Sequence, residues 1–169
     1  MQRGQPVLVD TNIIIEAVRT GCWNALRSHF SIETVDKCRE EARTGDLRRP
    51  GYVVVDDNAL RERLRVHAPT PQELSALDLR ELEARRLDAG ERHLWAHALA
   101  RNDAWLACCC DNAAIRVAVR LGWEDRLKSL EELAHAAGAN PAAAKLKEQF
   151  HTARLSATRT AALLERGLK

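Results

Sequence analysis

The sequence predicts an α/β domain with a central, mostly parallel sheet of four or five strands. Two apolar runs, 7–9 and 105–110, have the continuous apolar character of strands that are buried on both faces. Helical patterns separate and follow these runs, and this alternation is typical of a doubly wound fold with helices on both faces of the sheet. At 169 residues the chain is most simply one domain.

The first strand stops at the sequence Asp10-Thr11-Asn12. The apolar run 13–18 could extend the strand, but the polar break favours a helix that begins there and that Gly21 ends. A second helix is expected over 23–29, followed by a brief extended piece at 30–32. Thr34 is then the expected N-cap of a third helix, whose buried stripe is Val35, Cys38 and Ala42.

The middle of the chain carries weaker signals. Residues 52–55 read as a strand or an extended arm, and 64–68 as the next core strand. Thr70 and Pro71 have the residue types of an N-cap and a first helical position. A charged helical stretch is expected over 79–87.

The last third repeats the pattern of the first. A helix follows Asp111 and ends at Gly122, a short final strand is expected at 127–130, and a helix opened by Ser129 or Glu131 runs to Ala137. After the break at 138–141, one more helical segment is expected to fill the tail. The sequence allows three alternatives for this tail: it packs on the domain, pairs with a partner or stays partly disordered.

Composition excludes several classes of protein. The balance of 26 Lys and Arg against 24 Asp and Glu is too even to identify a nucleic-acid binder by charge alone. Five cysteines without Cys-x-x-Cys or Cys/His spacing indicate neither a disulfide framework nor a zinc site, so we expect reduced core residues and a cytoplasmic protein. No run is long enough to predict a membrane span.

Four acids stand where a parallel sheet would bring them together. Asp10 and Asp111 each close a core strand, and parallel strands end at the same edge of the sheet. Glu91 lies in the first turn of a helix, and Glu41 lies beside the buried stripe of another, although Glu40 is an alternative to Glu41. Clustered carboxylates repel one another and require a cation, and an all-oxygen ligand set favours Mg²⁺ or Mn²⁺. Such metals typically serve phosphodiester hydrolysis.

Three motifs resemble those of PIN domains, including the VapC-type toxin ribonucleases. They are Val-Asp-Thr-Asn at 9–12, Asp-x-Gly-Glu at 88–91 and Cys-Asp-Asn-x-Ala-Ile-Arg at 110–116. The resemblance covers about residues 6–137 and leaves 138–169 as a C-terminal helical extension. It implies a three-layer α/β/α sandwich whose acids bind Mg²⁺ or Mn²⁺ for the cleavage of RNA.

Carried over to this chain, the resemblance makes Asp10, Glu41, Glu91 and Asp111 the metal ligands and catalytic residues, with Asp88 as a possible addition. Thr11 and Asn12 would orient the first acid and meet the substrate. Asn112 stands where many members have a second Asp. Arg116 and Arg120 are candidates for phosphate contacts. The pair His93 and His97 has the spacing of two zinc ligands but lacks a third ligand nearby in the sequence, so we expect surface or capping residues.

The expected function is therefore a metal-dependent endoribonuclease with RNA as its partner. The resemblance also suggests the toxin of a toxin–antitoxin pair, bound to an antitoxin through the C-terminal helix, or a homodimer. The alternative is a PIN-like module that binds RNA or a protein through the C-terminal helix and has little catalysis. A nuclease requires Asp10 and Asp111, whereas a binding module requires residues 141–169.

Overall fold

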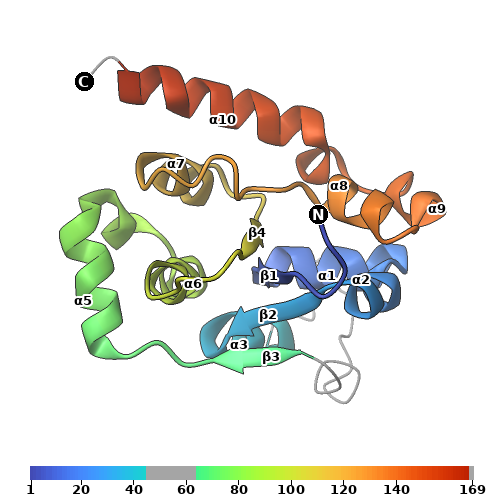
Figure 1. Cartoon of the computed structure of the whole chain (residues 1–169), viewed down its shortest axis with the longest axis horizontal. Helices are drawn as coiled ribbons and strands as arrows, with labels where there is room; N and C mark the ends of the chain where they lie inside the picture. The colour runs from blue at the N-terminus through green and yellow to red at the C-terminus, as the bar shows by residue number, and fades with distance from the viewer. Residues whose placement is uncertain (45–63, 168–169) are drawn as a thin grey trace.

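The computed structural model describes residues 1–44 and 64–167. It confirms the predicted α/β class: a parallel sheet lies between two layers of helices (Figure 1). The strands in this part of the chain are β1 (Pro6–Val9), β2 (Ser31–Val35), β3 (Arg65–His67) and β4 (Leu106–Cys108). Their order is β3-β2-β1-β4, and all three pairings are parallel.

The α-helices are α1 (Thr11–Thr20), α2 (Trp23–His29), α3 (Asp36–Thr44), α5 (Pro71–Arg80), α6 (Ala89–Leu99), α7 (Asn112–Arg120), α8 (Leu130–Ala136), α9 (Asn140–Ala143) and α10 (Thr152–Gly167). The 3₁₀ helices within residues 1–44 and 64–167 are η1 (Leu82–Arg86) and η2 (Glu148–Phe150). Capping boxes begin α5 at Thr70 and α8 at Ser129. Thr70 is the predicted N-cap, and of the two predicted alternatives Ser129 and Glu131 it is Ser129 that opens α8.

The side chains of β1 alternate between two apolar cores. Val7 and Val9 pack with α1, α2, α8 and α9, whereas Leu8 packs with α5, α6, α7 and α10. Figure 1 shows α6 and α7 to the left of the sheet and α2, α8 and α9 to its right. Because β1 is covered on both faces, its sequence is apolar throughout, and it lies at the centre of the sheet between β2 and β4.

All five cysteines are free thiols, and all but Cys110 are buried. They are core residues, as the sequence predicts. Among the helices that the structure describes, none combines the length and the apolarity needed to cross a bilayer.

Several predicted elements are wrong in detail. Thr34 is not an N-cap: it lies inside β2, where its hydroxyl donates to the Val9 carbonyl at 2.7 Å, and α3 begins only at Asp36. The strand at 64–68 exists as β3, but it lies at the edge of the sheet that the described residues form, and its Val66 is exposed. The expected strand at 127–130 is reduced to one bridge between Ala107 and Leu127.

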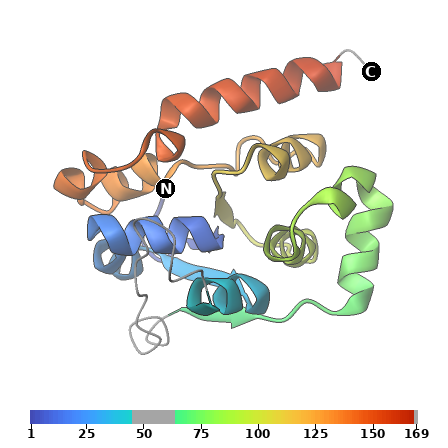
Figure 2. The ribbon, with the colours of Figure 1, turned by 180° about the vertical axis from the view of Figure 1, so that it is seen from behind.

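The two long helical stretches are interrupted. In the predicted stretch 79–87, α5 ends at Arg80 and η1 follows it, and the tail after 138 divides into α9, η2 and α10. The expected strand or arm at 52–55 lies outside the described residues. Helix α10 packs on the domain: it runs alongside α7 (Figures 1 and 2), and its Leu155 and Ala162 belong to the same core as Val117.

Candidate metal centre

A small cavity of about 10 Å³ lies beside the C-terminal end of β1, and its lining is mostly acidic. A cavity of this size is about what one water molecule, or one ion of similar size, requires. The residues that line it are Asp10, Thr11, Asn12, Cys38, Glu41, Asp88 and Glu91. They come from α1, α3 and α6 and from the N-caps of α1 and α6.

Asp10 follows the last residue of β1 and caps α1. Its Oδ1 accepts a hydrogen bond from the Ile13 amide at 2.8 Å, but its Oδ2 is buried and has no hydrogen-bond partner. The side chain is nearly inaccessible, and burial raises the pKa of Asp10 to about 7, with Asp88 and Asp111 adding to the rise. The Cys110 amide lies near enough to lower the pKa somewhat, but Oδ2 forms no hydrogen bond, which leaves one buried oxygen of this carboxylate without a partner.

Glu91 is held in the cavity by the first turn of α6. The carboxylate of Asp88 caps this helix by accepting a hydrogen bond from the Glu91 amide at 2.8 Å. Burial raises the pKa of Glu91 to about 8, and the charges of Asp111, Asp88 and Asp10 contribute to this rise. Without a cation nearby, the ionised forms of Glu91 and Asp10 are therefore costly. A hard divalent cation would offset this cost and accept their oxygens as ligands.

Asp111 caps α7, and its Oδ1 accepts hydrogen bonds from the amides of Ala113 at 2.6 Å and Ala114 at 3.1 Å. It is not among the residues that line the cavity, but its charge raises the pKa of both Asp10 and Glu91. Parallel pairing of β1 with β4 explains this proximity, because Val9 stands opposite Cys108.

The N-termini of α1, α6 and α7 are each capped by one of these acids. The positive ends of the helix dipoles partly offset the negative charge that gathers there. They do not remove it, since the pKa values of Asp10 and Glu91 stay raised.

Glu41 enters the cavity from α3. Its Oε2 lies 2.8 Å from the hydroxyl oxygen of Thr11, which also lies 3.1 Å from the Cys38 carbonyl oxygen. The prediction that Thr11 orients Asp10 is therefore wrong: Thr11 contacts α3, and Asp10 accepts its hydrogen bond from the Ile13 amide.

Gly90 leaves room for the Glu41 carboxylate in this position, because a Cβ there would stand 2.9 Å from Glu41 Oε2 and would push that side chain aside. Glu40 points to solvent and pairs with Lys37 at 3.0 Å, so Glu41 is the acid that faces the cavity.

The structure thus gathers most of the predicted site residues. Asp10, Thr11, Asn12, Glu41 and Glu91 line one cavity, together with Asp88. Arg116 stands apart: it lies on the outer face of α7, 3.5 Å from Glu165 of α10. Arg120 also lies away from the cavity, 3.7 Å from Glu81.

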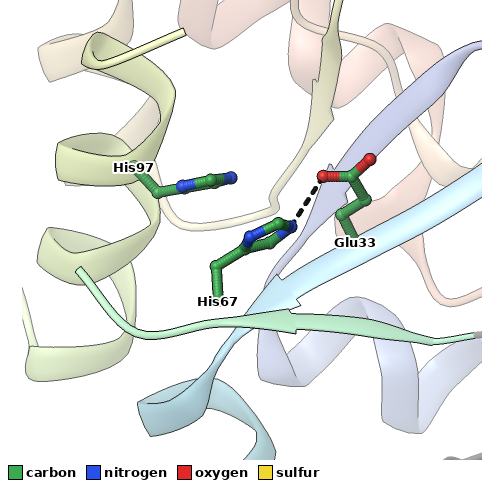
Figure 3. Close-up of side chains that lie close together, drawn as sticks. All are labelled: Glu33, His67 and His97. Carbon is green, nitrogen blue, oxygen red and sulfur yellow. Dashed lines mark hydrogen bonds and ion pairs between the residues drawn. The ribbon is translucent and has the colours of Figure 1, made fainter.

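A second group of titratable side chains could not be found in the sequence because its members are far apart in the chain. Glu33 of β2, His67 of β3 and His97 of α6 converge with ligand atoms within 4.8 Å of one another (Figure 3). His67 Nε2 lies 2.9 Å from Glu33 Oε2, and the two imidazole rings stack at 3.9 Å. His93, one turn before His97 on α6, does not join the group and lies beside Asp36.

These donors are of the type that zinc prefers, but an arginine already faces them. Arg101 Nη1 donates to the buried Glu33 carboxylate and lies 3.2 Å from His97 Nε2. The other nitrogens of Arg101 bind Asp103 at 2.6 and 2.8 Å. A metal would have to displace this guanidinium, so we interpret the group as an ion-pair network between the sheet and α6.

No protein-family model, no curated protein and no solved structure matches this chain. The likeness to PIN domains therefore stays a prediction that depends on the three sequence motifs.

Proposed function

We propose that this protein is a Mg²⁺- or Mn²⁺-dependent endoribonuclease. The observation that carries the proposal is Asp10, which lines one cavity with Glu41, Asp88 and Glu91 and whose buried Oδ2 has no hydrogen-bond partner. Such an arrangement of oxygen ligands suits a hard divalent cation. Asp10, Glu41 and Glu91 would hold it, with Asp111 beside them.

The acids that would bind the ion are already held in position by hydrogen bonds. Asp10 is fixed by the Ile13 amide and Glu41 by the Thr11 hydroxyl, so that little side-chain freedom is lost when the ion binds. When bound, the ion polarises a phosphoryl oxygen and lowers the pKa of a water molecule. The partly open acidic cavity favours a substrate that brings phosphate to the metal, and the resemblance to PIN domains favours RNA.

Cleavage of a fluorescent single-stranded RNA in Mn²⁺ tests this function. Mutation of a residue that only orients a metal ligand typically lowers activity by about 10- to 100-fold. Asp10 and Glu91 are proposed as ligands themselves, so we expect Asp10→Asn or Glu91→Gln to lower the cleavage rate by more than about 100-fold. Asn and Gln keep the size of the acids, so circular dichroism should show intact folds.

Glu40→Gln is the matched control, because Glu40 is an exposed acid one residue before Glu41. This variant should cut RNA at the wild-type rate. Equal cleavage by wild type, Asp10→Asn and Glu91→Gln would show that the acidic cavity is not the active site.

A further inference from the structure

A groove of about 170 Å³ lies on the surface where α7 and α10 pack together, and its lining begins at Asn112, the residue after Asp111. Its lining combines an amide, two arginines, a hydroxyl and two small apolar residues, namely Asn112, Arg116, Arg154, Thr158, Ala157 and Ala161. Figures 1 and 2 show α10 lying along the outer side of α7. The C-terminal helix thus forms a polar groove with α7, and the groove begins at Asn112, the residue after Asp111.

Asn112 links the groove to the acids. Its Oδ1 accepts a hydrogen bond from Thr158 Oγ1 at 3.0 Å and lies 3.4 Å from Arg154 Nη2. Both contacts use the oxygen of the amide, so the Nδ2 hydrogens are left to donate to another acceptor. Helix α10 therefore fixes the orientation of a hydrogen-bond donor directly beside Asp111.

Arg154 forms no ion pair within 4.0 Å among the described residues, and its side chain contacts the uncharged Asn112. It also lines a neighbouring cavity with Glu131 and Glu148, but Glu131 is already bound by His151 and the Thr152 amide. Arg116 pairs with Glu165, but both side chains are almost half exposed and 3.5 Å apart, which makes a weak pair that a stronger anion can displace. Both guanidiniums can form forked hydrogen bonds to phosphate oxygens.

We propose that this groove binds a phosphate of the RNA strand next to the one that is cut, with Arg154 as the main contact and Asn112 and Arg116 beside it. The inference rests on the proposed function, because it places the scissile phosphate at the acidic cavity. It assigns the C-terminal extension a role in substrate binding. The chain is nearly neutral overall, and this groove supplies local positive charge where the strand leaves the acids.

Binding of a fluorescent oligouridylate to the full chain in EDTA, followed by anisotropy over a series of salt concentrations, tests the groove separately from cleavage. Loss of one phosphate contact lowers the slope of log K against log salt by about 0.7 for a single strand. Arg154→Gln should weaken binding several-fold at low salt and show this smaller slope. Asn112→Asp should act in the same direction, because the new carboxylate would pair with Arg154.

Arg159→Gln is the matched control. Arg159 lies on the same helix, but its guanidinium donates to the Glu124 carbonyl, away from the groove. This variant should keep the wild-type affinity and slope.

The two proposals fail in different ways. If wild type binds RNA and Arg154→Gln lowers the slope, but Mn²⁺ produces no cleavage, the groove stands and the nuclease function fails. If wild type cuts RNA while Arg154→Gln and Asn112→Asp bind with the wild-type slope, the groove is wrong. Absence of any RNA binding by wild type in EDTA at low salt also overturns the groove.

Discussion

Asp10 is the side chain on which the proposed metal centre depends most. A carboxylate that is buried, hydrogen-bonded through one oxygen and unpartnered at the other is costly to ionise. Its neighbours Asp88 and Asp111 increase this cost. In the proposed metal centre, the features that make this acid costly to ionise would favour its binding to a cation.

The raised pKa values predict how the metal-free protein responds to pH. Asp10 and Glu91 titrate at about 7 and 8 in the folded protein and near 4 in the unfolded chain. Between about pH 4 and 8 the native state binds more protons, so stability falls as pH rises. We expect the midpoint of thermal unfolding in EDTA to be lower at pH 8 than at pH 5.

The variant Asp10→Asn tests how much of this pH dependence of stability is due to Asp10. The variant should gain stability relative to wild type at pH 8 more than at pH 5, because it has no charge to bury at either pH. A difference between the two proteins that is constant across this range would mean that Asp10 is not the group that titrates.

Gly90 controls the position of Glu41. A methyl group at this position would stand 2.9 Å from Glu41 Oε2 and 3.0 Å from Cys38 Sγ. We expect Gly90→Ala to displace Glu41 and to lower Mn²⁺-dependent cleavage at least about 10-fold, as loss of metal-site geometry typically does. Gly167→Ala, which has open space around it, should leave cleavage unchanged.

An unchanged cleavage rate in Gly90→Ala would contradict the role given to Glu41. Gly90→Ala replaces a helical glycine, so helix propensity by itself favours the variant by about 1 kcal/mol. A loss of activity is then not explained by a weakened helix.

The network around Glu33 joins the sheet to α6, the helix that carries Glu91. Removal of one partner from a buried ion pair leaves an uncompensated charge and costs about 3–5 kcal/mol. Arg101→Leu should therefore lower the free energy of unfolding in urea by about 3 kcal/mol, since His67 and the more distant Arg65 remain near Glu33.

The double variant Arg101→Leu with Glu33→Gln should recover part of this loss, because the buried charge is then absent. If the double variant is as unstable as the sum of the two single variants, the two side chains do not interact as described.

The elements that the sequence predicted well are those with a local signal. The strand at β1, the capped starts of α5 and α8 and the acid after β4 follow from apolar runs and capping residues. The error at β2 arose because Thr34 resembles an N-cap, while its actual partner is the Val9 carbonyl on the neighbouring strand. A hydrogen bond between residues 25 positions apart leaves no local pattern.

The residues of the candidate site likewise fall into those with a local sequence signal and those that depend on tertiary packing. Asp10 follows β1 directly, as predicted, whereas β4 ends at Cys108 and not at residue 110, so that Asp111 lies three residues beyond the strand and caps α7. The choice of Glu41 over Glu40 depends on which face of α3 is turned toward the cavity. The Glu33, His67 and His97 group needs the register of β2 with β3, which no local pattern specifies.

At the scale of the whole molecule, the C-terminal helix α10 covers part of the apolar core. Leu155 and Ala162 of α10 pack into the core that α6 and α7 share, and Arg166 binds Glu124 at 2.9 Å. The role of this tail could not be predicted from the sequence, because its apolar stripe is patchy. The structure shows that it covers α7, the helix whose N-terminus Asp111 caps.

Thermal unfolding with and without divalent metal is the most direct test of the acidic cavity as a metal site. A ligand that binds only the native state at 100 times its Kd stabilises it by about 2.7 kcal/mol. For a protein of this length this corresponds to about 5–10 °C. We expect millimolar Mn²⁺ to raise the midpoint of wild type and Glu40→Gln by this amount over EDTA, and to leave Asp10→Asn unchanged. An equal shift in all three proteins, or no shift in wild type, would contradict a metal centre at Asp10.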